Sequence, residues 1–143
     1  MNPLVELAAK IATDAHKGQT RWDGKTPYIS HPAAVAKAVE KKKFGPEYVA
    51  AAWLHDVLED THVTALDLAQ AGIPQDVISA VEALTKNEGE SYLKYIQSVG
   101  MNHIASVVKR EDIRNNMSDL DRKKRGSMYD KYEIALWYLE QEF

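Results

Sequence analysis

The sequence predicts an all-α protein that folds as a single domain. Apolar residues recur at spacings of three and four along most of the 143 residues, and the period-two alternation of a half-buried strand does not occur. No Gly/Ser-rich linker, internal repeat or shift in composition divides the chain, and its length suits one sizeable core. We therefore expect one bundle of helices over residues 1–143.

Three helices and one long loop are expected in the first half. The first helix begins at Pro3, since proline is tolerated in a first helical turn, and it ends at His16. Gly18, Gly24 and Pro27 then forbid regular structure until a second helix begins at Pro32. A third helix follows Gly45-Pro46 and continues through Asp60, because its residues are strongly helix-forming and mostly apolar.

The second half is expected to add five helices. They cover residues 65–72, 74–86, 91–99, 101–120 and 128–143, with a basic turn over residues 121–127. In the segment 91–99, Tyr92, Leu93 and Ile96 are expected to face the core, and Tyr95 to face outward. Every segment of regular structure that the sequence predicts is helical.

Composition narrows the possible functions. A net charge of −3 argues against non-specific binding to nucleic acid or to an anionic membrane. The sequence has neither a transmembrane-length apolar run nor the layout of a signal peptide, so a cytoplasmic location is expected. The absence of cysteine excludes disulfides and thiolate ligands, so any metal site must use nitrogen and oxygen donors.

Four ionisable residues stand in the otherwise apolar third helix. At roughly 100° per residue, His55, Asp56 and Glu59 fall within about one quadrant of the helix, and Asp60 lies at its edge. Such a group repels itself in a low-dielectric setting, so either it binds a cation or it faces water. Because carboxylates near a helix C-terminus also oppose the helix dipole, we favour a bound divalent cation over an exposed charged face.

Two other segments carry candidate binding residues. The loop after the first helix contains Lys17, Arg21, Trp22 and Lys25, and such a loop could hold a phosphorylated aromatic ligand. Composition equally allows a solvated loop anchored by a buried Trp22. Further along, a carboxylate, an amide and an ammonium lie about one turn apart in the segment 101–120, where an ordinary solvated face is the alternative; these are Asp112, Asn116 and Lys109.

A metal site can be assembled from these parts. The imidazoles of His31 and His55 and the carboxylates of Asp56 and Asp112 form a ligand set suited to Mn²⁺, Fe²⁺ or Zn²⁺. A metal of this kind acidifies bound water and neutralises phosphate oxygens, which phosphate-ester hydrolysis requires. Glu59 and Asp60, one turn beyond the ligands, would then orient water or move protons.

The order His31, His55-Asp56, Asp112 resembles that of the metal-dependent HD phosphohydrolase superfamily. More narrowly, AHKGQTRWDGKTPYISHP, LHDVLEDT and VKREDIRNNM are similar to the hydrolase domain of Rel/SpoT-type enzymes and to stand-alone small alarmone hydrolases. The resemblance runs from about Ala15 to Met117 and implies an HD-type helical bundle. The Glu-Asp pair after His-Asp is more specific to this branch than the His-Asp dipeptide itself.

The resemblance implies a Mn²⁺-dependent hydrolase that removes pyrophosphate from the 3′ position of ppGpp, a small phosphorylated nucleotide of the stringent response. It implies that His31, His55, Asp56 and Asp112 bind the metal and that Glu59 and Asp60 are the catalytic acid pair. It also implies that Arg21 stacks on the nucleobase and that Asn116 and Tyr132 contact the nucleotide. On charge, we add three phosphate contacts, which are Lys17, Lys109 and Arg114.

Departures from the pattern leave other substrates open. Trp22 stands where the larger family commonly has lysine, and Arg110-Glu111 precede Asp112 in place of apolar residues. The alternatives are ppApp, the 2′-phosphate of NADPH and a nucleoside monophosphate. A non-catalytic nucleotide-binding module is less favoured, because no ligand or acid of the motif is missing. With 143 residues we expect a hydrolase without a synthetase domain, and the sequence indicates no oligomeric state.

Overall fold

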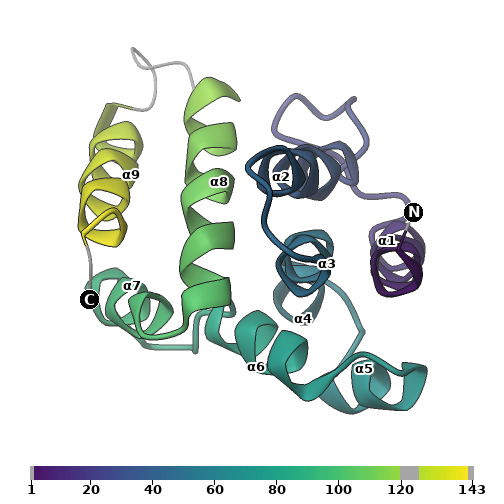
Figure 1. Ribbon diagram of the computed structural model, residues 1–143. Helices are drawn as coiled ribbons and strands as arrows, with labels where there is room; N and C mark the ends of the chain where they lie inside the picture. Colours follow the sequence, from purple (N-terminus) through teal and green to yellow (C-terminus); the bar gives the residue numbers. More distant parts are fainter. Residues whose placement is uncertain (1, 120–125, 142–143) are drawn as a thin grey trace.

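The computed structural model describes residues 2–119 and 126–141, and regular structure within them is helical (Figure 1). The helices are α1 (Pro3–Ala15), α2 (Ser30–Lys41), α3 (Pro46–Leu54), α4 (Val57–Asp60), α5 (Ala65–Ala71), α6 (Gln75–Ala83), α7 (Tyr92–Gly100), α8 (His103–Asp119) and α9 (Gly126–Leu139). The prediction of an all-α fold is confirmed. No helix in the described ranges is both long and apolar enough to cross a bilayer.

Helix α3 is the centre of the bundle. It packs against α1, α2, α6 and α8, and α8 in turn separates α2 and α3 from α9 (Figure 1). Close approach on several sides is possible because α3 carries three consecutive alanines, Ala50–Ala52, all fully buried. The chain therefore places the end of α3, where His55 follows, deep inside the protein.

Leu54 at the end of α3 offers a test of this packing. Its side chain is fully buried, so Leu54→Ala is expected to lower the free energy of unfolding by about 2–5 kcal/mol. The matched control is Leu66→Ala on α5, because Leu66 is 65% exposed. This substitution should lower the free energy of unfolding by no more than about 0.5 kcal/mol. Denaturant titration measures both, and equal losses would contradict a core built around α3.

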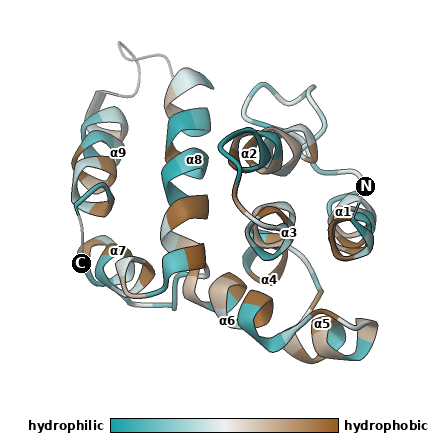
Figure 2. Ribbon diagram, viewed as in Figure 1, coloured by the Kyte–Doolittle hydropathy of each residue, from teal (hydrophilic) through white to brown (hydrophobic). Residues whose placement is uncertain are grey.

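Helix α8 changes character along its length. Figure 2 shows hydrophobic residues toward its N-terminal half, where Ala105, Val107 and Val108 are buried, and mostly hydrophilic residues toward its C-terminal half. The first half therefore contributes to the core, and the second half brings polar side chains to the end of the bundle beside α2.

The predicted third helix is wrong in one respect, because it does not continue through Asp60. It ends at Leu54, and His55 and Asp56 form a turn before the four-residue α4. The His55 side chain explains the break: its Nδ1 lies 2.6 Å from the Ala52 carbonyl oxygen, which its own backbone N–H reaches only at 3.5 Å. A side chain that bonds a nearby carbonyl competes with the helical ladder at that point.

Smaller differences concern helix ends and faces. His31 lies inside the first turn of α2, which begins at Ser30, rather than before it. On α7 the predicted faces are wrong for two residues: Tyr95 is buried and donates to the Leu84 carbonyl, whereas Leu93 is 63% exposed. The buried stripe of α7 runs through Tyr95, Ile96 and Val99, and Leu93 lies off it. Residues 120–125, which include most of the predicted basic turn, lie outside the described residues, as do 142–143 at the end of the last predicted helix.

Candidate active site

Four predicted metal ligands converge in the structure. His31 Nε2 lies 2.7 Å from Asp112 Oδ1, and His55 Nε2 lies 3.3 Å from both of these atoms. Asp56 Oδ2 completes the group at 3.1 Å from His55 Nε2 and 3.9 Å from His31 Nε2. The four come from the start of α2, the break after α3 and the middle of α8, so the fold assembles the cluster from separate segments.

The remaining ring nitrogens fix how both imidazoles face the cluster. His31 Nδ1 lies 2.6 Å from Asn115 Oδ1, and His55 Nδ1 lies 2.6 Å from the Ala52 carbonyl oxygen. Because both partners are acceptors, each Nδ1 carries the proton and donates, which turns the Nε2 lone pairs toward the carboxylates. Four acceptor atoms then face one another in a largely buried space, an arrangement that requires a cation or a proton. The donor set therefore fits a divalent metal.

The pKa of His55 gives this site a pH dependence. Burial opposes a charge on His55, but the carboxylates of Asp56 and Asp112 outweigh it and raise the pKa well above its ordinary value. In the metal-free protein the imidazole thus holds a proton near neutral pH, and metal binding must release it. We expect metal affinity to rise with pH through and above neutrality, because the raised pKa keeps the competing proton on His55 there. Titration calorimetry in buffers of different ionisation enthalpy detects the released proton, and a constant affinity with no release would contradict this assignment.

Asn115 is a further candidate site residue, which the sequence did not indicate. It lies three residues after Asp112 and therefore on the same face of α8, but helical spacing and the resemblance both pointed to its neighbour Asn116. Since Asn115 orients His31, Asn115→Ala is expected to weaken metal binding about 10–100-fold. Metal titration measures the change, with Asn87→Ala on an exposed loop as control. Equal affinities in the two variants would rule out an orienting role.

The acid pair lies at the open side of the cluster. Carboxylate oxygens of Asp56, Glu59 and Asp60 all lie within 4.8 Å of one another. Partial desolvation raises the pKa of both Glu59 and Asp60, and the neighbouring carboxylates raise it further. Glu59 also accepts the backbone N–H of Lys86 at 3.3 Å. Such groups are suited to taking up and releasing protons closer to neutral pH than ordinary carboxylates.

Polar side chains surround the two aspartates. Tyr28, which was also missed, donates its hydroxyl to Asp56 Oδ2 at 2.6 Å. The Lys109 ammonium lies 2.8 Å from Asp112 Oδ2, and the Asn116 amide donates to Asp112 Oδ1 at 3.2 Å. The Asp112 carboxylate is thereby held on both oxygens, which fixes its direction toward the histidines.

Arg21 connects the long loop to the end of α8. Its Nη2 donates to Asn116 Oδ1 at 3.2 Å and to Asp119 Oδ2 at 2.8 Å, and its guanidinium lies 4.7 Å from the centre of the Trp22 ring. Trp22 is 48% exposed, so the alternative of a loop anchored by a buried Trp22 is wrong. Asp119 gave no signal in the sequence beyond its place one turn after Asn116.

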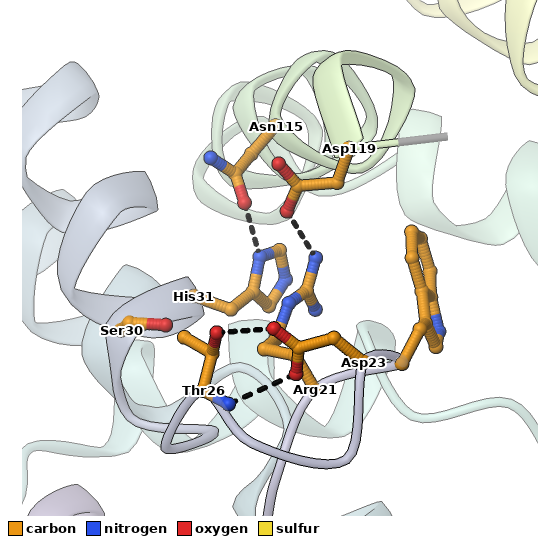
Figure 3. A pocket seen from close by; sticks show the side chains of 8 residues that line it. Arg21, Asp23, Thr26, Ser30, His31, Asn115 and Asp119 are labelled. Carbon is orange, nitrogen blue, oxygen red and sulfur yellow. Dashed lines mark hydrogen bonds and ion pairs between the residues drawn. The ribbon is translucent and has the colours of Figure 1, made fainter. Parts of the chain in front are cut away.

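Two adjoining cavities meet at Arg21, Trp22 and His31. The inner one, of about 220 Å³, is lined by both catalytic candidates, by three of the four metal candidates and by their neighbours: Arg21, Trp22, Tyr28, His31, Asp56, Glu59, Asp60, Lys109, Asp112, Asn116 and Tyr132. His55 is not among these lining residues. The outer one, of about 410 Å³, lies between the long loop and the C-terminal end of α8, where Asn115 points toward His31 and Asp119 toward Arg21 (Figure 3). Together they give space for a ligand larger than a phosphate group.

Two predicted phosphate contacts are not brought to this cavity. Lys17 is exposed beyond the end of α1 and is not among the lining residues of either cavity. Arg114 pairs with Glu111, and with Glu140 at 2.8 Å, on another face of α8. Of the three phosphate contacts predicted on charge, Lys109 alone lines the inner cavity.

The sequence and the fold of this chain are similar to those of known proteins. The family model described as "HD domain" matches residues 8–118, a range that contains all four converging side chains. The chain belongs to the HD domain family. Its fold agrees with a solved structure described as a metazoan ortholog of SpoT that hydrolyzes ppGpp, with a TM-score of 0.80 over 97% of this chain and 86% of the other, at 21% identity.

Curated relatives of this HD domain include proteins of very different length. The bifunctional (p)ppGpp synthase/hydrolase SpoT of Escherichia coli K12 is 34% identical over 131 residues, which are 80% of this chain but 18% of that protein. The MESH1 protein of Xenopus tropicalis, named a guanosine-3′,5′-bis(diphosphate) 3′-pyrophosphohydrolase, is 35% identical over 83% of this chain and 70% of its own length. The chain thus spans less than a fifth of the bacterial relative and most of the shorter animal one.

Proposed function

We propose that this HD domain is a metal-dependent hydrolase that removes pyrophosphate from the 3′ position of ppGpp. The observation that carries the proposal is a cluster of two imidazoles and two carboxylates next to a carboxylate pair. Three members of the cluster, His31, Asp56 and Asp112, line one cavity together with Glu59, Asp60 and Arg21. The names of the relatives support the same substrate, both for the long bacterial enzyme and for the shorter animal one. We take residues 1–143 as one hydrolase domain, and the cytoplasmic location stays a prediction.

His31, His55, Asp56 and Asp112 would hold the divalent ion. We propose Mn²⁺, with Fe²⁺ and Zn²⁺ as alternatives that the same nitrogen and oxygen donors accept. When bound, such an ion lowers the pKa of water and neutralises charge on phosphate oxygens. The buried cluster and its two fixed imidazoles support this role.

The chain's own side chains supply the remaining functions. The raised pKa values of Glu59 and Asp60 support a role in holding and moving the proton of the attacking water. Arg21, oriented by Asn116 and Asp119, offers a flat cation on which a nucleobase can stack. Lys109 and Tyr132 line the same cavity and are available to the phosphates.

A product assay tests the proposal. Purified protein with added Mn²⁺ is incubated separately with ppGpp, ppApp, NADPH and a nucleoside monophosphate, and released pyrophosphate or phosphate is measured. We expect pyrophosphate from ppGpp, and its loss when a chelator is added. Turnover of NADPH or a monophosphate alone would replace the proposed substrate by another nucleotide, and turnover of none would favour the non-catalytic binding module.

A further inference from the structure

A buried histidine next to the acid pair has no part in the reaction proposed above. His16 follows the last residue of α1 and is 2% exposed. Its Nε2 is fully buried and has no hydrogen-bond partner among the described residues. A buried ring nitrogen without a partner is costly, whereas an aromatic hydrocarbon would fill the same space without that cost. A role for His16 is therefore expected in the contacts of its other ring nitrogen, Nδ1.

One connection from His16 leads to Asp60. His16 Nδ1 lies 2.8 Å from Gln19 Oε1, and Gln19 Nε2 donates to the backbone carbonyl of Asp60 at 2.9 Å. The Asp60 carbonyl can only accept, so the Gln19 amide must turn its NH₂ toward it and its oxygen toward the ring. His16 must then donate from Nδ1. The pair fixes a carbonyl at the end of α4, where no helical partner remains.

A second connection leads from His16 to Asp56. The rings of His16 and Tyr28 pack with their centres 4.9 Å apart, and the Tyr28 hydroxyl donates to Asp56 Oδ2 at 2.6 Å. Backbone bonds support the geometry, because Tyr28 N–H donates to the Gln19 carbonyl at 2.8 Å and Gln19 N–H to the His16 carbonyl at 3.0 Å. His16 thus contacts both residues that bind the two ends of α4.

Helix α4 depends on such support. It has only four residues, and Asp56, which precedes it, forms no side-chain cap. A helix of this length is not stable by itself, because ordering the backbone of its first turn costs more free energy than the hydrogen bonds of one turn recover. Asp56, a proposed metal ligand, directly precedes α4, and Asp60, a proposed catalytic acid, is its last residue. Any movement of α4 therefore changes the distance between the proposed metal site and the proposed acid.

We propose that His16 is a positioning residue for catalysis, which sets Asp60 relative to Asp56 through Gln19 and Tyr28. The inference rests on the proposed function for its effect on turnover, but its effect on α4 can be measured without substrate. Loss of the His16 Nδ1 donor should let α4 shift while the metal ligands remain in place. A displacement of about 1 Å in a catalytic group reduces turnover about 100-fold.

Turnover kinetics of three variants provide the first test. His16→Phe keeps the ring but removes the donor, His16→Asn restores a donor near the Nδ1 position, and Gln19→Ala cuts the connection further along. With ppGpp and Mn²⁺, we expect kcat to fall about 10–100-fold in His16→Phe and Gln19→Ala, with KM and metal content unchanged, and to recover in His16→Asn. The control is Gln70→Ala on the exposed side of α5. Wild-type kcat in His16→Phe, or equal losses in His16→Phe and His16→Asn, would overturn the proposal.

Amide hydrogen exchange provides the second test and needs no substrate. The amides of Asp60 and Thr61 bond to the carbonyls of Asp56 and Val57 at 3.0 and 3.2 Å. We expect both to exchange faster in His16→Phe and Gln19→Ala, and at the wild-type rate in Gln70→Ala. Unchanged exchange would overturn the positioning role whatever the substrate is. An inactive wild type with the expected exchange would instead overturn the proposed function and leave the support of α4 by His16 established.

Discussion

The Asp112→Ala protein is expected to lose its bound metal and nearly all turnover. Asp112 Oδ1 lies within 3.3 Å of both histidine Nε2 atoms, so its removal takes a central donor from the cluster. The change also leaves the Lys109 ammonium without the carboxylate it pairs with at 2.8 Å. An unpaired buried charge of this kind typically costs about 3–5 kcal/mol of stability.

Elemental analysis of the purified protein measures the metal, and circular dichroism shows whether the variant is folded. Because Asp112→Ala also destabilises the protein, Asp112→Asn serves as a second variant that keeps the shape of the side chain. The control is Asp14→Asn on the exposed side of α1. If the control and both Asp112 variants each contain about one Mn, Fe or Zn per chain, Asp112 is not a metal ligand.

Glu59→Gln and Asp60→Asn are expected to separate catalysis from metal binding. Neither residue is among the four donors that converge around the two histidine Nε2 atoms, so the variants should retain the metal held there. If they transfer protons, turnover of ppGpp should fall by about 10²–10⁴-fold. The amide side chains are close in shape to the carboxyl side chains, but they cannot take up and release the proton. A large loss of turnover would therefore come from the lost proton transfer and not from a cavity.

Single-turnover kinetics with ppGpp and elemental analysis test this pair together. Glu88→Gln, on an exposed loop, is the matched control. Near-normal rates in both Glu59→Gln and Asp60→Asn would reject proton transfer by this pair. A loss of metal in either would assign that carboxylate to the metal cluster instead.

Much of the fold could be predicted because the spacing of apolar residues that indicates a helix is a local feature of the sequence. The short helix α5 is an example, since its range agrees within one residue with the predicted 65–72. The Thr64 side chain caps its first turn, and Gly72, at φ 104°, closes it, and both residue types are common at such positions. The break at His55 could not be predicted in the same way. It depends on the His55 ring turning toward the Ala52 carbonyl, and that direction is set by neighbours far away in the sequence.

The candidate metal cluster could be predicted from residue types, and helical spacing placed Lys109 and Asn116 beside Asp112. Contacts between distant segments could not be predicted. Tyr28 reaches Asp56 across 28 positions, and nothing in the sequence around either residue indicates the contact. Arg114 is a different case. Two positions correspond to about 200° around a helix, so Arg114 lies almost opposite Asp112, and helix geometry alone excluded it from the cavity.

If Arg21 stacks on a nucleobase as proposed, its contacts also bear on how tightly the nucleotide is held. The guanidinium is bound to Asn116 and Asp119 and lies against Trp22 before any ligand arrives. Its rotational freedom is therefore lost during folding, and ligand binding is spared the roughly 0.5–1.5 kcal/mol that ordering such a side chain costs. The proposed stacking surface is preorganised, and a carboxylate on the last turn of α8 would thereby contribute to affinity without touching the nucleobase.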